Sequence, residues 1–382
     1  MRIDLRRVPE LDGVRGAAIL MVLLSHCFSW AMLGHSWSLA PRLIAQATRP
    51  LGADGVDLFF VLSGYLITGI LLDSVGKNHY LRNFYARRAL RILPLYYTTL
   101  ILILLVYPGS AEYVLLGSIY LSNVTPLFGV AAIYGTLWSL SVEEHYYLVW
   151  LWLVKKLSRR GLAVAGLSVC AVEPLLRAFA YFHGGESGIY YYSWFRFDSL
   201  ATGAILALFV RSKWYSQESL YVWGLVCFVA AGLLGLVGRG STVFDYAFDF
   251  TYLNLVFVSL LAVVLSGKIS LLNRLARQRW MVYCGEISYF LYLSQLIVLD
   301  EWDKHIGTYP AAMVGLISPF GAIVVRAVGT CAICFALREL SRRYFEGPIL
   351  KLKRYFAYSG PAVADAPRIS VGPAEAEPAS NG

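Results

Sequence analysis

The sequence predicts an all-α integral membrane protein, a bundle of about ten transmembrane helices. Of its 382 residues, 58% are hydrophobic and 15% are charged, and the mean hydropathy is +0.59. No water-soluble chain of this length tolerates that balance on its surface. Apolar runs of about 20 residues, enough to cross a hydrocarbon core as a helix, recur along the whole chain. Lysine and arginine gather in every second loop between these runs, which is typical of multi-pass membrane proteins.

The apolar runs also predict how the chain is divided. We place the ten spans near residues 13–33, 53–73, 91–108, 137–154, 161–180, 195–211, 220–238, 251–267, 282–300 and 313–337. The segment 113–134 is apolar but short, and is interpreted as a re-entrant or interfacial piece. We expect residues 1–358 to form the membrane domain. Residues 359–382 are rich in Ala, Pro and Glu, hold too little apolar material to fold, and are predicted to be a disordered cytoplasmic tail.

Loop charges predict the orientation and exclude one class of protein. The positive-inside rule places both termini in the cytoplasm, which requires an even number of spans. Arg42 and Arg49, in the first outer loop, depart from this rule. The net charge of +9 is spread over short loops, which favours cytoplasmic loop charge over nucleic-acid binding. The six cysteines lie nearly all within apolar segments and are interpreted as packing residues.

The first apolar segment, LDGVRGAAILMVLLSH, carries an arginine near one end and a histidine near the other. On a helix, Arg15 and His26 point from the same face and lie about 16 Å apart, and Asp12 shares that face. An ionisable residue inside a span is costly unless it lines a cavity or has a partner, which favours a functional site. The alternative is that Arg15 anchors the helix at the lipid headgroups and His26 is an ordinary hydrogen-bonded histidine of the bundle.

Two further motifs sit in the next two spans. In GVDLFFVLSGYLITGIL, Asp57 lies at the outer edge of the span. Ser63 and Gly64 are small residues that would let helices pack closely. Alternatively, Ser63 would orient an acyl thioester or an acceptor hydroxyl. In RNFYARRALRILPLYY, Arg88 and Arg91 share a helix face at the cytoplasmic edge. Their forked, permanently charged groups suit phosphates, although anchoring at the membrane surface is the alternative.

Polar residues also enter the fourth and sixth spans. In GTLWSLSVEEHYYLVWLW, we expect Glu143 to serve acid-base chemistry by orienting a histidine, whereas Glu144 and His145 are assigned to the solvated outer headgroup level. In WFRFDSLATGAILAL, Arg196 and Asp198 form either a structural pair or part of an acceptor site. No cluster has metal-ligand spacing, and no phosphate-cradling glycine loop or GxSxG motif occurs.

Taken in order along nearly the whole chain, these motifs resemble the acyltransferase 3 family of multi-pass membrane acyltransferases. Each motif matches a family pattern: an arginine and a histidine eleven positions apart within LDGxRGxA, the FFxxSG motif, paired arginines before a proline, the WSLSxE segment, FRFD and FEGPILKLKR. The residues that match are Arg15, His26, Phe59, Phe60, Ser63, Gly64, Arg88, Arg91, Pro94, Trp138 to Glu143, Glu346 and Pro348. One position departs: Gln295 ends ISYFLYLSQ, where many relatives have histidine, so a catalytic role there is in doubt.

The resemblance implies an O-acyltransferase of the bacterial inner membrane with acetyl-CoA, or another acyl-CoA, as donor and no permanently bound cofactor. Arg15, Arg88 and Arg91 would hold the donor phosphates. His26 would act as general base or carry the acyl group transiently, and Glu143 would orient it. The acceptor would be a surface glycan such as exopolysaccharide, capsule or lipopolysaccharide O-antigen. Its contacts are assigned to Asp12, Asp57, Ser63, Gly64, Trp138, Ser141, Arg196 and Asp198.

Two other functions remain open from the sequence. A transporter or flippase of glycan or lipid intermediates fits ten spans with buried charges, but no internal repeat is apparent, and many transporters have one. A scaffold subunit of an envelope assembly would have no need of costly intramembrane Arg, His and Glu.

Overall fold

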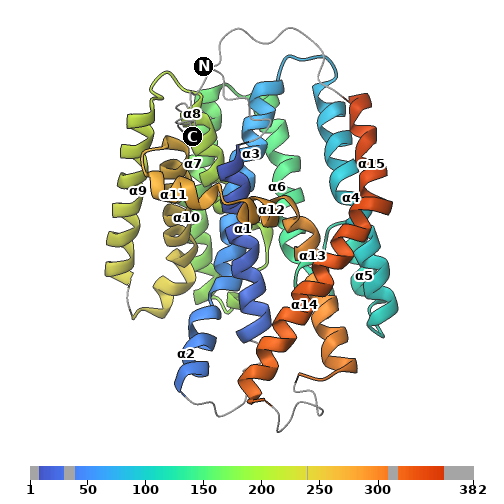
Figure 1. The fold of residues 1–382 in the computed structure, drawn as a ribbon. Helices are drawn as coiled ribbons and strands as arrows, with labels where there is room; N and C mark the ends of the chain where they lie inside the picture. Colours follow the sequence, from blue (N-terminus) through green and yellow to red (C-terminus); the bar gives the residue numbers. More distant parts are fainter. Residues whose placement is uncertain (1–7, 30–38, 239, 309–316, 357–382) are drawn as a thin grey trace, which may run out of the picture.

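The computed structural model describes residues 8–29, 39–238, 240–308 and 317–356, which form helices and no strand. The long helices lie side by side in a bundle (Figure 1). The helices are α1 Pro9–Leu24, α2 Leu39–Thr48, α3 Leu51–Ser74, α4 Tyr80–Val106, α5 Ala111–Ser118, α6 Leu137–Lys156, α7 Arg159–Phe182, α8 Phe197–Val210, α9 Gln217–Gly238, α10 Thr242–Ser266, α11 Ser270–Ala276, α12 Arg279–Glu286, α13 Ser288–His305, α14 Pro319–Ser341 and α15 Gly347–Lys351. The all-helical fold class is therefore confirmed. The predicted disordered tail, residues 359–382, lies outside the described residues.

Within the described residues, each of the ten predicted spans overlaps a helix; residues 30–33 of the first span and 313–316 of the last lie outside the described residues. Not every helix has the length and composition of a span. Seven helical segments of the described chain do, and α12 with α13, bent by 73° at their junction, would make an eighth. The other two predicted spans are α6 and α8. α6 carries two carboxylates in an otherwise apolar sequence, and α8 has 14 residues. At 1.5 Å per residue α8 is shorter than the hydrocarbon core, so a count of ten is reached only if both helices also cross.

Local sequence explains where several helices begin and end. The Ser158 hydroxyl accepts a hydrogen bond from the Gly161 amide at 3.2 Å, which caps the start of α7. Ser318 caps α14 in the same way, and Pro319 follows at the first helical position, where its missing amide hydrogen costs nothing. α10 ends at Gly267, whose φ of +70° is the left-handed conformation that glycine adopts without strain.

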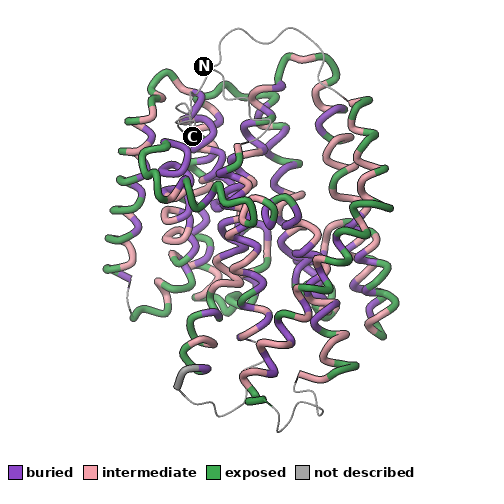
Figure 2. Tube along the Cα trace, in the orientation of Figure 1, coloured by how far each residue is buried: buried purple, intermediate pink, exposed green. Residues whose placement is uncertain are grey.

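The centre of the bundle is α3. Of the apolar stretch in Pro41–Ser74, 72% is buried, against 22% in α9, which therefore lies at the periphery. Buried positions follow α1, α3 and α8, whereas the outward faces of α9, α14 and α15 are exposed (Figure 2). Exposed apolar side chains on those faces are expected, because lipid is their solvent.

Glycines let two pairs of helices approach closely. A Cβ on Gly64 of α3 would lie 1.9 Å from the carbonyl oxygen of Leu200 in α8, and a Cβ on Gly203 would lie 1.9 Å from that of Val61. In the same way α12 lies across α1 (Figure 1), where a Cβ on Gly16 would meet the Met281 carbonyl oxygen at 2.0 Å. The surroundings of Gly64 are therefore those that the packing interpretation describes, a close contact between two helices. Small residues commonly occupy such helix crossings in membrane proteins.

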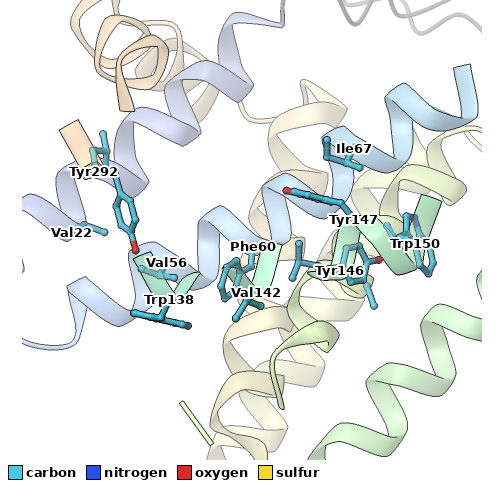
Figure 3. Close-up of a cluster of buried hydrophobic side chains, with 14 of the residues drawn as sticks. Val22, Val56, Phe60, Ile67, Trp138, Val142, Tyr146, Tyr147, Trp150 and Tyr292 are labelled. Atoms are coloured by element: carbon cyan, nitrogen blue, oxygen red, sulfur yellow. The ribbon is translucent and has the colours of Figure 1, made fainter. Parts of the chain in front are cut away.

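Aromatic side chains fill the space between α1, α3, α6 and α13. Figure 3 shows Phe60 of α3 and Trp138 of α6 together, with Tyr147 farther along α6. The rings of Phe60 and Trp138 are in a T-shaped arrangement, with their centroids 6.0 Å apart. Tyr292 of α13 directs its hydroxyl toward α6, where it lies 2.6 Å from Ser139 Oγ. This aromatic layer fixes α6 against α3, and so fixes the polar residues that α6 carries.

Candidate functional site

The Arg88 guanidinium joins α4 to α6. Its Nε donates to Glu144 Oε1 at 3.0 Å, its Nη2 lies 3.7 Å from Glu143 Oε2, and its Cζ stacks 3.9 Å from the centroid of the Tyr147 ring. Tyr147 stands four residues after Glu143 and three after Glu144, so on the surface of α6 its side chain is a neighbour of both carboxylates. Assigning Glu144 to the solvated outer headgroup level was therefore wrong: it is an ion-pair partner of Arg88, inside the bundle.

Glu143 accepts two hydrogen bonds besides its ion pair. Ser63 Oγ donates to its Oε1 at 2.9 Å, and the Tyr147 hydroxyl donates to its Oε2 at 3.0 Å. The structure thus brings together Ser63, Glu143 and Arg88, which the sequence motifs named separately. Tyr147 was missed, although its spacing of four residues from Glu143 was a usable signal. The carboxylate is 16% exposed, so it is fixed by protein donors yet still reached by solvent.

Arg15 and Arg91 extend this cluster toward α1. Arg15 Nη1 pairs with Asp12 Oδ1 at 2.8 Å and interacts electrostatically with Glu143. Arg91 interacts electrostatically with Arg15 and Arg88, and its side chain is exposed. We call Arg15, Arg88 and Arg91 the arginine cluster. Within the described part of the chain, Arg91 makes no hydrogen bond or ion pair, which leaves its guanidinium free to meet an anion.

His26 lies at the other end of α1, in a π-helix formed by Ser25–Ser29. Its Nδ1 is buried and has no hydrogen-bond partner among the described residues. The neighbouring side chain is Gln295 of α13, which is fully buried and whose two amide atoms likewise lack a partner of normal hydrogen-bond geometry. The position at which the sequence departs from its family pattern therefore lies beside the predicted catalytic histidine.

The expected pairing of Glu143 with His26 is not found. No hydrogen bond or ion pair joins them within the described chain, because Ser63, Tyr147 and Arg88 occupy the carboxylate. The expectation assumed that equal distance from the helix ends means equal depth in the membrane. α4 enters the bundle so that Arg88 meets the middle of α6, and this places Glu143 with the arginine cluster instead.

Six predicted acceptor-binding residues are buried. They are Asp57, Gly64, Trp138, Ser141, Arg196 and Asp198. Arg196 pairs with Asp57, not with Asp198, and its Cζ lies 3.7 Å from the centroid of the Phe250 ring. Asp198 instead accepts from Arg177 Nη2 at 2.9 Å, a partner that the motifs did not indicate. Ser141 Oγ lies 2.7 Å from Ser122 Oγ. Contact of these six residues with an acceptor stays a prediction, and their burial does not favour it. The other two predicted acceptor-binding residues, Asp12 and Ser63, border the arginine cluster.

Comparison with known proteins identifies the family. The family model described as an acyltransferase domain, the acyltransferase 3 family, matches residues 8–339. The chain belongs to this family. The matched residues include the arginine cluster, Glu143, His26 and Gln295, so the whole candidate site lies within the acyltransferase domain, while α15 lies beyond it.

Three curated relatives are similar to this family member over most of its length. OatA of Listeria monocytogenes, a peptidoglycan O-acetyltransferase, is 29% identical over 92% of the chain. YrhL of Bacillus subtilis, a provisionally named peptidoglycan O-acetyltransferase, is 29% identical over 90%. A provisionally named O-acetyltransferase of Staphylococcus aureus (strain COL) is 25% identical over 91%. The chain covers 57%, 55% and 58% of these relatives, respectively, a little over half of each. No solved structure matches the chain.

Proposed function

We propose that the chain is a membrane O-acetyltransferase that moves an acetyl group from acyl-CoA in the cytoplasm to a hydroxyl of a cell-surface glycan. One observation carries the proposal: three arginines from α1 and α4 converge beside Glu143, and His26, whose Nδ1 has no hydrogen-bond partner among the described residues, lies eleven residues beyond Arg15, past the C-terminal end of α1. The family and the relatives support acyl transfer, and two relatives are named for peptidoglycan.

The arginine cluster suits the donor phosphates. Asp12 and Glu144 already hold Arg15 and Arg88 in place, so little side-chain entropy is lost when an anion binds. Arg91 supplies a free charge. The loop between α3 and α4 contains Lys77 and lies at the same end of the molecule as α15 (Figure 1), which contains Lys351 and is followed by Lys353 and Arg354. The positive-inside rule then makes this end cytoplasmic, where acyl-CoA is available.

Acyl transfer follows from the spacing between the two ends of α1. With the phosphates at the arginine cluster, the long pantetheine arm of CoA extends along α1 toward His26, about 16 Å away. The neutral imidazole takes the proton of the acceptor hydroxyl as that oxygen attacks the thioester carbonyl. A C–O bond forms, the C–S bond breaks, and the proton passes on from His26 to the departing thiolate. In the alternative scheme, His26 first carries the acetyl group itself.

The glycan acceptor is tested by mass spectrometry of surface glycans from three strains: native, deleted for this gene, and deleted but complemented. We expect the deletion strain to lack one acetyl unit per modified sugar and complementation to restore it. The modified fraction then identifies the acceptor as peptidoglycan, exopolysaccharide, capsule or O-antigen. Unchanged acetylation of every glycan fraction contradicts a glycan acceptor. Accumulation of unexported glycan inside the cell would instead support a transporter.

Arg91→Gln is expected to raise the KM for acetyl-CoA about tenfold to a hundredfold, because a hydrogen bond to a charged group contributes about 1.5–3 kcal/mol. This substitution is cleaner than replacing Arg88, which would leave Glu144 without its partner. The measurement is the initial rate of acetyl transfer in proteoliposomes as a function of acetyl-CoA concentration. The control is Arg82→Gln on the same helix, an exposed cation 5.8 Å from the Phe356 ring. An equal change in KM for both variants would contradict a specific donor contact of Arg91 and show that only the general positive charge of this surface matters.

A further inference from the structure

The π-helix that carries His26 is held by polar contacts to α2 and to Arg49, the residue that follows α2. Ser25 Oγ donates to the carbonyl oxygen of Arg49 at 3.2 Å, and Ser29 Oγ lies 2.9 Å from Thr48 Oγ1. A π-helix is less stable than an α-helix, and single π turns occur frequently at functional sites. Such contacts fix both ends of the turn. The two serine contacts do not involve the middle of the π-helix, next to His26, which is held by another element.

That element is α14, through a buried arginine. Arg326 Nη1 donates to the carbonyl oxygen of Cys27 at 3.2 Å, one residue beyond His26. The other two nitrogens of the same guanidinium are held by Asp303 of α13, with Nε to Oδ1 at 2.6 Å and Nη2 to Oδ2 at 2.5 Å. Arg326 is 4% exposed. A bidentate carboxylate fixes the plane of a guanidinium, so the third nitrogen is aimed at one point on the π-helix.

His26 has few contacts of its own that could orient its ring. Its Nδ1 has no hydrogen-bond partner among the described residues, and Gln295 is the neighbouring polar group. The direction of the imidazole therefore depends on the backbone that carries it. Cys27 is buried against Leu299 and Ala327, so the carbonyl that Arg326 holds is part of a packed surface.

We infer that Arg326, fixed by Asp303, is a positioning residue that sets the orientation of the His26 imidazole for acetyl transfer. The inference rests on the proposed acetyltransferase function. It gives a role to the ion pair of Arg326 and Asp303, neither of which is among the proposed donor-binding or acceptor-binding residues. Arg326 contacts neither substrate in this scheme and acts only through the backbone at Cys27.

A matched control lies at the opposite end of the helix bundle. Arg211, the residue that follows α8, donates two hydrogen bonds of 2.8 Å to Asp73, and its Nη1 donates to the carbonyl oxygen of Ala207 at 3.1 Å. Arg211 is 6% exposed, close to Arg326. The two arginines therefore make the same set of bonds, a bidentate carboxylate and one helix carbonyl, but only Arg326 holds a carbonyl beside His26.

The experiment compares Arg326→Lys, Asp303→Asn and Arg211→Lys with the native protein in proteoliposomes. Lysine keeps the charge but cannot form the bidentate pair. We expect Arg326→Lys and Asp303→Asn to lower kcat about tenfold or more, since a small displacement of a catalytic group can cost up to about a hundredfold. The KM for acetyl-CoA should stay within about twofold, because the arginine cluster is untouched. Arg211→Lys should keep the native kcat.

A second readout does not depend on turnover. Diethyl pyrocarbonate acylates accessible imidazoles, and peptide mass spectrometry resolves its rate at His26 from that at the other five histidines. We expect this rate to change in Arg326→Lys and Asp303→Asn, and to stay native in Arg211→Lys. Asp303→Asn retains the shape of the side chain, so it keeps the inference testable if Arg326→Lys does not fold.

The outcomes separate the two proposals. If His26→Ala is inactive while Arg326→Lys and Asp303→Asn match Arg211→Lys in kcat and in His26 acylation rate, the positioning role is overturned and the proposed function stands. If His26→Ala is fully active, the proposed base fails and the positioning role fails with it. A fall in kcat that is equal in all three variants, together with equal losses of melting temperature, reduces Arg326 to a structural residue.

Discussion

Replacing His26 by alanine is expected to lower the rate of acetyl transfer by a factor of about 10² to 10⁴, the usual contribution of a positioned general base. The protein should still reach the membrane in native amounts, because alanine is well tolerated in helices and no hydrogen bond to the Nδ1 atom of His26 is lost. The KM for acetyl-CoA should remain close to native, since the arginine cluster lies at the other end of α1. The measurement is transfer of labelled acetyl from acetyl-CoA to isolated cell-wall glycan by proteoliposomes.

The matched control for this prediction is His145→Ala. The Nδ1 of His145 lies 2.7 Å from Ser193 Oγ, so this histidine already has a protein partner and plays no part in the proposed mechanism. We expect near-native transfer from it. Full activity of His26→Ala would exclude His26 as base and as acyl carrier alike. Labelled acetyl trapped on His26 of the native protein without acceptor would favour the scheme in which the histidine carries the acyl group.

The helical fold is largely predictable from the sequence because hydropathy is a local property. As far as the described residues extend, the ten predicted spans overlap helices, including α6, where the apolar pattern continues past Glu143 and Glu144. The glycine at position 64 was equally readable, since small residues in a span favour close helix packing. Hydropathy does not indicate the 73° bend between α12 and α13, nor that α12 packs across α1, because both are tertiary features.

The site is predictable in its members but not in its pairings. Arg88, Ser63 and Glu143 were all named from motifs, yet Glu143 lies 80 residues from Ser63 in the chain, and Glu144 lies 56 residues from Arg88. Separations of that size carry no local signal. Tyr147 is the exception: it was missed although it stands four residues after Glu143, a spacing that places two side chains on one helix face. For Arg196 the sequence left open a structural pair with Asp198 or an acceptor role, and its actual partner, Asp57, lies 139 residues away in the chain.

Replacing Arg196 by methionine is expected to destabilise the protein by about 3–5 kcal/mol, the cost of leaving one member of a buried ion pair alone. Arg196 and Asp57 are both 0% exposed, so neither water nor lipid headgroups can replace the missing partner. Asp57 Oδ2 already lacks a hydrogen-bond partner among the described residues, which makes the carboxylate unusually dependent on Arg196. The measurement is the free energy of unfolding in detergent, from a titration with sodium dodecyl sulfate.

The matched comparison is the exposed pair of Glu218 and Lys268, whose side chains are 67% and 43% exposed. Glu218→Gln should cost less than about 1 kcal/mol, because solvent screens such pairs. The double variant Asp57→Asn with Arg196→Met should lose less stability than the sum of its single variants, since removing the carboxylate's charge removes most of the penalty of isolating it. Additive losses, or an Arg196→Met variant as stable as native, would show that the pair is not an energetic unit. An acceptor role for Arg196 would instead appear as lost transfer at unchanged stability, which its full burial argues against.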